Sequence, residues 1–214
     1  MNKIYFLILC FIPSIAFTGV NERSQANKIV TSYQERAGSA EEILSNPPFD
    51  IEDRTRVCGL CHGKDGNSTH TDIPSLAGQN PRYFVEQLIV FQNAGRYPKM
   101  MHDIAKKMDD ETMVTIAVYY STLPRLVTMP VDTSLDEQGK KLYTELCIHC
   151  HGEGATGANN NYASIRAQRP DYLTTTIKRL RNGDRKRTSH VMSTVVKGMS
   201  DQEITALANY IAGL

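Results

Sequence analysis

The sequence predicts an all-α protein that contains two tandem copies of one small domain. The pentapeptide Cys-Gly-Leu-Cys-His at 58–62 recurs 89 residues later, at 147–151, as Cys-Ile-His-Cys-His. Each copy also ends in apolar residues spaced i, i+3, i+4 and i+7, which is one face of an amphipathic helix. These residues are Met113, Ile116, Ala117 and Tyr120 in the first copy and Ile204, Leu207, Ala208 and Ile211 in the second. A repeat of this length indicates a duplicated domain.

The composition of the 214-residue chain fits two small globular domains. Hydrophobic residues make up 41% and charged residues 22%, which is ordinary for a soluble protein. The formal net charge is +1, so the total charge gives no indication of a nucleic-acid partner.

Residues 1–18 are expected to be a signal peptide that exports the chain to the periplasm. Lys3 precedes an apolar run from Ile4 to Phe17, and small residues near Ala16 offer a cleavage site. The run is shorter than the roughly 20 residues that a membrane span needs. The alternative is an uncleaved anchor, which would leave the protein loosely associated with the membrane. Cleavage would remove Cys10 with the signal.

The rest of the chain is expected to divide into an N-terminal extension at 19–48, a first domain at 49–123, a linker at 124–133 and a second domain at 134–214. In the extension, Lys28–Arg36 is expected to be helical, and no function is assigned to it. Asp109 is expected to cap the last helix of the first copy. In the second copy, Ser200 and Glu203 form the pattern of a capping box.

The repeated pentapeptide is the C-x-x-C-H pattern that attaches haem c. The thiols of Cys58 and Cys61, and of Cys147 and Cys150, would add across the two vinyl groups of a porphyrin. His62 and His151 would then coordinate the two irons. A shared zinc site is disfavoured because 85 residues separate the two cysteine pairs, and thioredoxin-like chemistry would need a βαβ pattern that is absent.

The second iron ligand in each copy is expected to be a methionine, Met101 or Met192, whose soft thioether favours reduced iron. Each lies eight residues before the helix cap of its copy. Other residues remain open as alternatives: Met100 competes with Met101, and His102 or His190 is able to replace a methionine. Met108 and Met199 also repeat, but they directly precede the caps and are expected in the core.

Arg96 and Arg185 occupy matching places before the two methionine loops. A guanidinium is suited to bidentate contacts with the propionates of a haem, so both residues are candidates for binding the cofactor. The alternative for each is a solvated surface arginine.

Taken together, these residues resemble the cytochrome c4 family of dihaem cytochromes over about 49–214. The resemblance is carried by the stretch 58–68, by Ile-Pro-Ser-Leu-Ala-Gly-Gln at 73–79, by Arg82-Tyr83, and by Met101 before Met108-Asp109. It implies two class I cytochrome c folds, each around one covalent haem, and a haem-to-haem interface. It also implies the ligand pairs His62/Met101 and His151/Met192, and a Pro74 carbonyl that orients His62.

The chain departs from this family in two places. Ala163 stands where the first copy has Pro74, which puts the backbone near His151 in doubt. The family's helix before the haem motif carries a glycine and an aromatic residue, which the second copy has as Gly139 and Tyr143. The first copy has Asp50 and Arg54 there, so its helix packing must differ.

The function implied by the resemblance is electron transfer, without turnover of a small-molecule substrate, from a quinol–cytochrome c reductase to a terminal oxidase. The alternatives are a cytochrome subunit of a periplasmic dehydrogenase, a dihaem peroxidase and a sulfur-compound dehydrogenase. An acidic redox partner is expected to dock on a basic run in the second copy, and the alternative is that this run is a solvated face without a partner. This run comprises Lys178, Arg179, Arg181, Arg185, Lys186 and Arg187.

Overall fold

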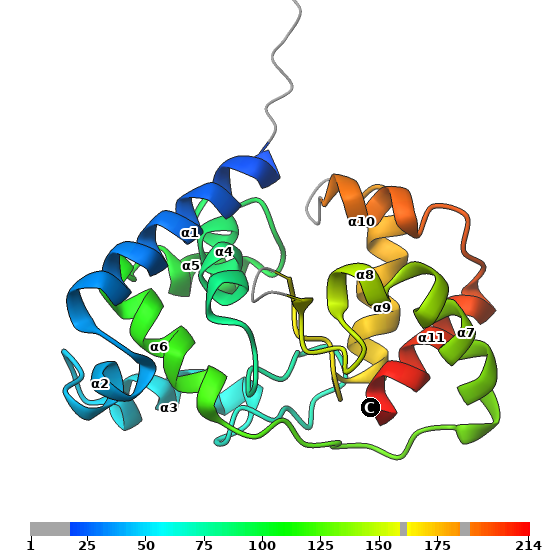
Figure 1. Cartoon of the computed structure of the whole chain (residues 1–214), viewed down its shortest axis with the longest axis horizontal. Coiled ribbons are helices and arrows are strands. Elements are labelled where there is room, and N and C mark those ends of the chain that lie inside the picture. Colours follow the sequence, from blue (N-terminus) through cyan, green and yellow to red (C-terminus); the bar gives the residue numbers. More distant parts are fainter. Residues whose placement is uncertain (1–17, 159–161, 185–188) are drawn as a thin grey trace, which may run out of the picture.

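The computed structural model describes residues 18–158, 162–184 and 189–214, so the expected signal peptide lies outside the described residues. Its helices form two halves that lie side by side (Figure 1). The helices of the first half are α1 Thr18–Ala37, α2 Ala40–Ser45, α3 Ile51–His62, α4 Pro81–Gln92, α5 Lys99–Ala105 and α6 Asp110–Thr122. Those of the second half are the 3-10 helix η1 Thr133–Leu135, then α7 Asp136–Leu146, α8 Ile148–His151, α9 Pro170–Arg181, α10 His190–Val195 and α11 Asp201–Gly213.

The expected caps of the last helices are confirmed. The Asp109 side chain accepts a hydrogen bond of 2.8 Å from the Thr112 backbone N–H at the start of α6. At the start of α11, Ser200 and Glu203 form both hydrogen bonds of a capping box. These bonds satisfy backbone donors that a helix leaves open at its N-terminus.

The second half has its own apolar core, in which α11 packs along α7 and α9. Gly139 permits the close crossing of α7 and α11, because a Cβ at this position would lie 2.4 Å from the Ala206 carbonyl oxygen. Tyr143 lies one turn further along α7 and is buried. Gly139 and Tyr143 thus pack against the last helix, as expected from the sequence.

In the first half, the last helix packs against different helices. Here α3 makes few contacts with α6, and α6 packs mainly against α4, α2 and α1. Asp50 caps α3, and Arg54 lies exposed over the ring of Phe49. The two residues that replace the glycine and the aromatic therefore serve their own helix instead of a crossing with α6.

The helices of the N-terminal extension, α1 and α2, pack against α4 and α6 of the first half. Helix α1 includes the expected stretch Lys28–Arg36 and is longer in both directions. Ala26, Val30 and Tyr33 are buried in the core of the first half, together with Ile43 of α2. Figure 1 shows α1 lying over the first half, and α1 and α4 are in contact. The extension is thus part of the fold of the first half.

The two halves meet through the loops that follow the repeated motif. Gln79 exchanges two hydrogen bonds with the backbone of Ser164, and Gln168 exchanges two with the backbone of Ser75. Each pair is related to the other by the repeat offset of 89 residues, so the interface has approximate two-fold symmetry.

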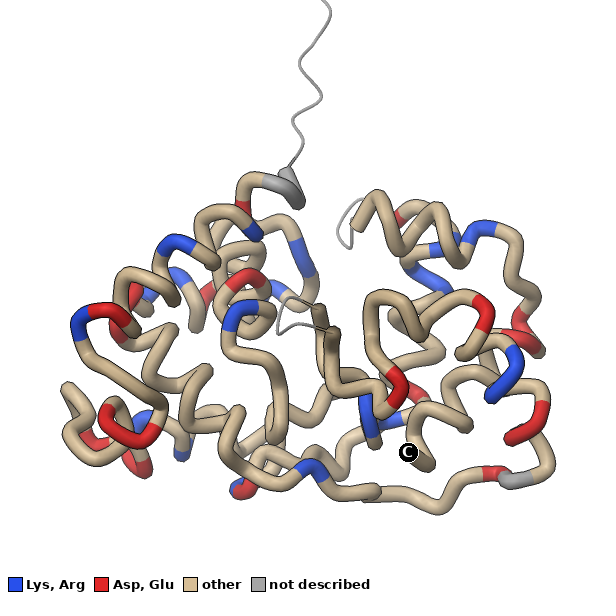
Figure 2. Tube along the Cα trace, in the orientation of Figure 1, with Lys and Arg blue, Asp and Glu red and all other residues tan. Residues whose placement is uncertain are grey.

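Both signs of charge are distributed over both halves, as Figure 2 shows. Within the described part of the chain, no helix combines the length and apolarity needed to cross a lipid bilayer.

Candidate functional site

The C-x-x-C-H motif ends helix α3 in the first half, whereas in the second half Cys147 follows α7 and the rest of the motif forms the short helix α8. Cys58 and Cys61 lie in the last turns of α3, which ends at His62. Gly63 follows with a positive φ of 85°, and a Cβ there would lie 2.2 Å from the Asn67 carbonyl oxygen. Glycine is therefore required for the turn that leaves the motif. Among the described residues, the four motif cysteines form no disulfide.

Both motif histidines are buried and held in the same way. His62 Nδ1 lies 2.7 Å from the Pro74 carbonyl oxygen, and His151 Nδ1 lies 2.9 Å from that of Ala163. A carbonyl oxygen only accepts, so Nδ1 carries the proton and Nε2 keeps its lone pair. The replacement of Pro74 by Ala163 in the second copy therefore leaves this hydrogen bond in place.

The electrostatic setting keeps both imidazoles neutral. Burial lowers the pKa of His62 and of His151 below the ordinary value, and the hydrogen bond to the backbone only partly opposes it. A neutral imidazole with a free Nε2 is the form that coordinates a metal.

The cysteines suit covalent attachment of haem better than zinc binding. Burial raises the pKa of the Cys58 thiol, and it raises that of Cys147 to about 12. Zinc requires thiolates, and the described residues contain no group of three or more His, Cys, Asp or Glu placed to hold a metal ion. A thiol adds across a vinyl group with one new S–C bond and one new C–H bond, so the step needs no oxidant and expels no leaving group.

The candidate methionines differ from their neighbours in burial. Met101 is partly buried against the core of the first half, together with Cys58, and Met192 against that of the second half, together with Cys147. Met100 is 56% exposed. In each half a thioether and the first motif thiol therefore border one apolar core, and the second thiol and the imidazole follow within the same motif. This donor set fits one haem c.

The remaining methionines and histidines have other surroundings. Met199 is buried, and Met108 packs against the first core, as expected for core residues. His102 Nδ1 lies 2.8 Å from the Phe91 carbonyl oxygen, and His190 is exposed at the start of α10.

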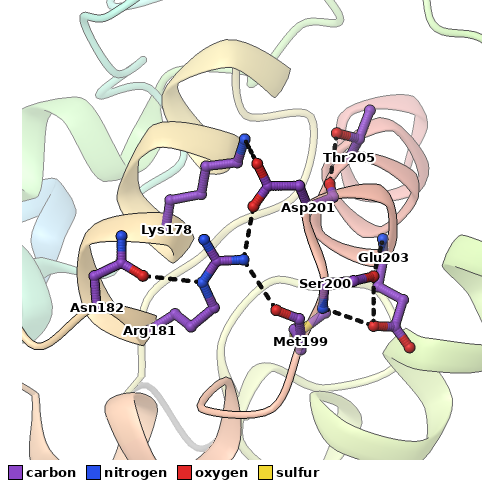
Figure 3. Close-up of polar contacts among 8 residues, drawn as sticks. All are labelled: Lys178, Arg181, Asn182, Met199, Ser200, Asp201, Glu203 and Thr205. Carbon is purple, nitrogen blue, oxygen red and sulfur yellow. Dashed lines mark hydrogen bonds and ion pairs between the residues drawn. The ribbon is translucent and has the colours of Figure 1, made fainter.

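The sequence did not predict the contacts that hold the segments around the two candidate methionines, between α4 and α6 and between α9 and α11. In the second half, Arg181 Nη1 donates to the Met199 carbonyl at 3.0 Å and to Asp201 at 2.7 Å. Lys178 reaches the other Asp201 oxygen at 2.8 Å, so two basic residues of α9 hold the start of α11 (Figure 3). In the first half, Gln92 donates to the Met108 carbonyl at 2.9 Å. The repeat offset aligns Gln92 with Arg181, which was the signal available in the sequence.

Arg96 lies at the junction of the two halves. It donates to Gln87 Oε1 and to the Tyr172 hydroxyl, at 2.6 Å each, and its guanidinium lies over the ring of Phe91. Burial is the main cause of the lowered pKa of His62, and the positive charge of Arg96 lowers it further. Arg185, the matching candidate, lies outside the described residues.

Known proteins resemble the chain in sequence and fold. A family model described as cytochrome c matches residues 137–214. The chain is 34% identical over 170 residues to cytochrome c4 of Thiocapsa roseopersicina, covering 74% of this chain and 87% of the relative. It is 30% identical over 168 residues to the "Thiosulfate dehydrogenase electron acceptor" of Thiomonas intermedia (strain K12), covering 72% and 77%. The crystal structure of reduced recombinant cytochrome c4 from Pseudomonas stutzeri matches with a TM-score of 0.69 and 29% identity, covering 77% of this chain and 96% of that one.

Proposed function

Because the chain belongs to the cytochrome c4 family, we propose that it works in the periplasm as a carrier of single electrons between redox proteins. The family places two cytochrome c domains in the fold and two covalently bound haem c groups in the chain. The function as a dihaem electron carrier follows from the same relatives. We propose in addition the roles of individual residues, the redox partners and the periplasmic location.

The observation that carries the residue roles is the arrangement common to both halves. In each, the motif histidine is held at Nδ1 by a backbone carbonyl, and a methionine borders the same apolar core as the first motif cysteine. We assign His62 and Met101 to one iron and His151 and Met192 to the other. Cys58, Cys61, Cys147 and Cys150 form the thioether links. Arg96 and Arg185 are assigned to the propionates.

Haem c supplies a one-electron iron couple when bound. With haem c held by its motif residues, each half would accept one electron from a reduced partner, which would thereby be oxidised, and would pass it to an oxidised partner. The histidine and methionine side chains of each half would hold the iron from both sides, so no coordination position would be left for a small molecule. The apolar cores keep water away and hold the ligands in place.

The intact mass and the colour of the protein test the assignment of two covalently bound haems. The intact mass of the mature protein should exceed that of the polypeptide by two haems, and the colour should survive acid-acetone extraction. Cys58→Ala and Cys147→Ala should each leave one haem held by a single thioether. A mass increase of one haem, or bound zinc, would contradict the proposal.

The proposed partners are a quinol–cytochrome c reductase as donor and a terminal oxidase as acceptor. A thiosulfate dehydrogenase is the second candidate donor, because the relative from Thiomonas intermedia is named as the electron acceptor of such an enzyme. Stopped-flow reduction by each purified donor separates the two. The physiological donor should reduce the protein at a rate that depends on the donor concentration, and the other donor should be far slower.

A dihaem enzyme is the functional alternative. A peroxidase or a sulfur-compound dehydrogenase needs an open or labile axial position. Addition of cyanide to the reduced and oxidised protein, with a peroxide activity assay alongside, distinguishes the two. An electron carrier should bind cyanide slowly and turn over no peroxide, whereas rapid binding at one haem would favour the enzyme.

A further inference from the structure

Each proposed histidine ligand is connected to a glutamine of the opposite half through a single peptide group. His62 Nδ1 donates to the Pro74 carbonyl at 2.7 Å, and the N–H of the same peptide group belongs to Ser75. That N–H donates to Gln168 Oε1 at 2.8 Å. The chain of hydrogen bonds therefore runs from the histidine of the first half to a glutamine of the second.

The second half repeats this arrangement with the roles exchanged. His151 Nδ1 donates to the Ala163 carbonyl at 2.9 Å, and the Ser164 N–H of that peptide group donates to Gln79 Oε1 at 2.7 Å. Because Gln79 and Gln168 are separated by the repeat offset, the two connections are equivalent by sequence as well as by geometry.

The glutamine side chains are fixed in orientation by their other partners. Gln79 Nε2 donates to the Ser164 carbonyl at 2.9 Å, and its Oε1 also accepts from the Asn80 N–H. Gln168 Nε2 donates to the Ser75 carbonyl at 3.0 Å, and its Oε1 also accepts from the Arg169 N–H. Both glutamines and both serines are at most 8% exposed, so water does not compete for these bonds.

Hydrogen bonds at the two ends of a peptide group strengthen each other. When the N–H donates, the carbonyl oxygen becomes more negative and is a better acceptor. A stronger acceptor at Nδ1–H gives the imidazole more electron density to donate through Nε2. More donation from the axial histidine stabilises oxidised iron and lowers its reduction potential.

We propose that Gln79 and Gln168 are positioning residues that tune the axial histidine of the opposite half: Gln79 acts on His151, and Gln168 acts on His62. The proposal rests on the assignment of these histidines as iron ligands. It makes the contact between the halves a determinant of both reduction potentials, since neither histidine has its full hydrogen-bond chain without the other half.

The test is the reduction potential of each haem in full-length Gln79→Met and Gln168→Met protein. Each haem is followed separately in a redox titration by NMR, through haem methyl resonances assigned by their contacts with residues of one half. Gln79→Met should raise the potential of the haem at His151 and leave the other nearly unchanged, and Gln168→Met should do the reverse. A tenfold change in the one-electron equilibrium of a haem corresponds to a shift of ~59 mV in its reduction potential.

Two further variants separate this effect from a disturbed interface. Asn80→Ser loses the Asn80 bond to the Tyr162 carbonyl across the interface but keeps a side chain able to cap α4, so both potentials should stay at wild-type values. Gln79→Glu keeps an acceptor for the Ser164 N–H, so the potential of the haem at His151 should not rise. This variant also supports the test should Gln79→Met not fold.

The outcomes distinguish this proposal from the proposed function. Equal shifts of both haems in every variant, or no shift in either glutamine variant, would overturn the cross-interface tuning. A wild-type protein without the spectrum of histidine–methionine ligation would instead overturn the ligand assignment on which the tuning rests.

Discussion

Arg181 and Met199 are joined by a 3.0 Å hydrogen bond from the guanidinium Nη1 to the backbone carbonyl, and this bond connects the end of α9 to the residue before α11, across the segment that contains α10 and Met192. The equivalent bond in the first half runs from Gln92 to the Met108 carbonyl at 2.9 Å, across the segment that contains α5 and Met101. Gln92 adds a second bond, to the Ala105 carbonyl at 3.0 Å. The equivalent segment is thus held by a neutral amide in one half and by a charged guanidinium in the other.

We expect Arg181→Ala to weaken the bond between Met192 and its iron. The variant removes a hydrogen bond from a charged donor to a part-buried carbonyl, which contributes about 1.5–3 kcal/mol. The weak red-end charge-transfer band of methionine ligation should be lost earlier for the second haem on titration with denaturant. Arg181→Gln reproduces the side chain of the first half and should restore much of the loss. Arg179→Ala, at an exposed position of the same helix, is the control; equal behaviour of Arg181→Ala and Arg179→Ala would contradict the prediction.

The ion pairs of Asp201 predict a pH dependence confined to the second half. Hydrogen bonds from Lys178 and Arg181 lower the pKa of Asp201 below its usual value. A carboxyl group with a lowered folded pKa stabilises the fold above its unfolded pKa, and this contribution disappears as the pH falls through the folded pKa. Asp201→Asn should therefore destabilise the second half at pH 7 and match wild type in strong acid. Thermal unfolding followed at each haem measures this, and a difference that persists unchanged in strong acid would refute it. High salt should reduce the difference, because Asp201 is exposed.

Met101→Ala and Met192→Ala should each remove about half of the charge-transfer band of the oxidised protein, because each methionine is proposed to ligate one of two irons. Met100→Ala is the matched control, since Met100 is the adjacent residue and its side chain is exposed. The near-infrared spectrum gives the result directly. A full band in Met101→Ala together with a halved band in Met100→Ala would transfer the ligand role to Met100.

The extension should be indispensable for the first half. Ile43 of α2 is 2% exposed and packs in the core with α6. Ile43→Ala should lower the free energy of unfolding of the first half by about 2–5 kcal/mol, the usual cost of such a cavity. Lys28→Ala, at an exposed position of α1, should leave the free energy of unfolding within about 0.5 kcal/mol of wild type. Denaturant titrations followed at the first haem would show this, and an unperturbed Ile43→Ala variant would mean that the extension is dispensable.

Local signals in the sequence were sufficient for much of the fold. The caps at Asp109 and Ser200 could be predicted because a capping residue and its partner lie within three residues of each other. The sequence predicts a helix only over Lys28–Arg36 of the extension, whereas the observed helix α1 begins at Thr18. Its first turns are mostly polar, and the buried Ala26 could not be assigned to a face until the surface of the first half was known.

Contacts between distant residues could not be predicted in the same way. Gln79 and Gln168 are separated by the repeat offset of 89 residues, but their partners at Ser164 and Ser75 depend on how the two halves dock. Likewise the sequence places Lys178 in a basic run that is expected to be an open surface. Its partner Asp201 lies 23 residues away, and only the folded structure brings α9 beside the start of α11.

The ion pairs of Asp201 determine which charge reversal is suitable for testing partner docking on the basic run. Lys178 and Arg181 are held by Asp201, so Lys178→Glu would place two carboxylates together and disturb the fold itself. Arg179 is exposed, and Lys186 and Arg187 lie outside the described residues. The appropriate charge reversal is therefore Arg179, Lys186 and Arg187 to Glu.

This triple reversal should slow electron exchange with an acidic partner at low salt and leave both haem spectra unchanged. Charges at the rim of an interface act mainly on the association rate, and salt screens them over a Debye length of about 8 Å at physiological ionic strength. The wild-type rate should accordingly fall as salt rises and approach that of the variant. Stopped-flow measurements with the native donor and acceptor over a range of ionic strength give both comparisons. Reversal of the exposed residues Glu41 and Glu52 of the first half to Lys controls for a general effect of net charge. A rate that ignores both salt and the triple reversal would show that this face is solvated surface and that the partner docks elsewhere.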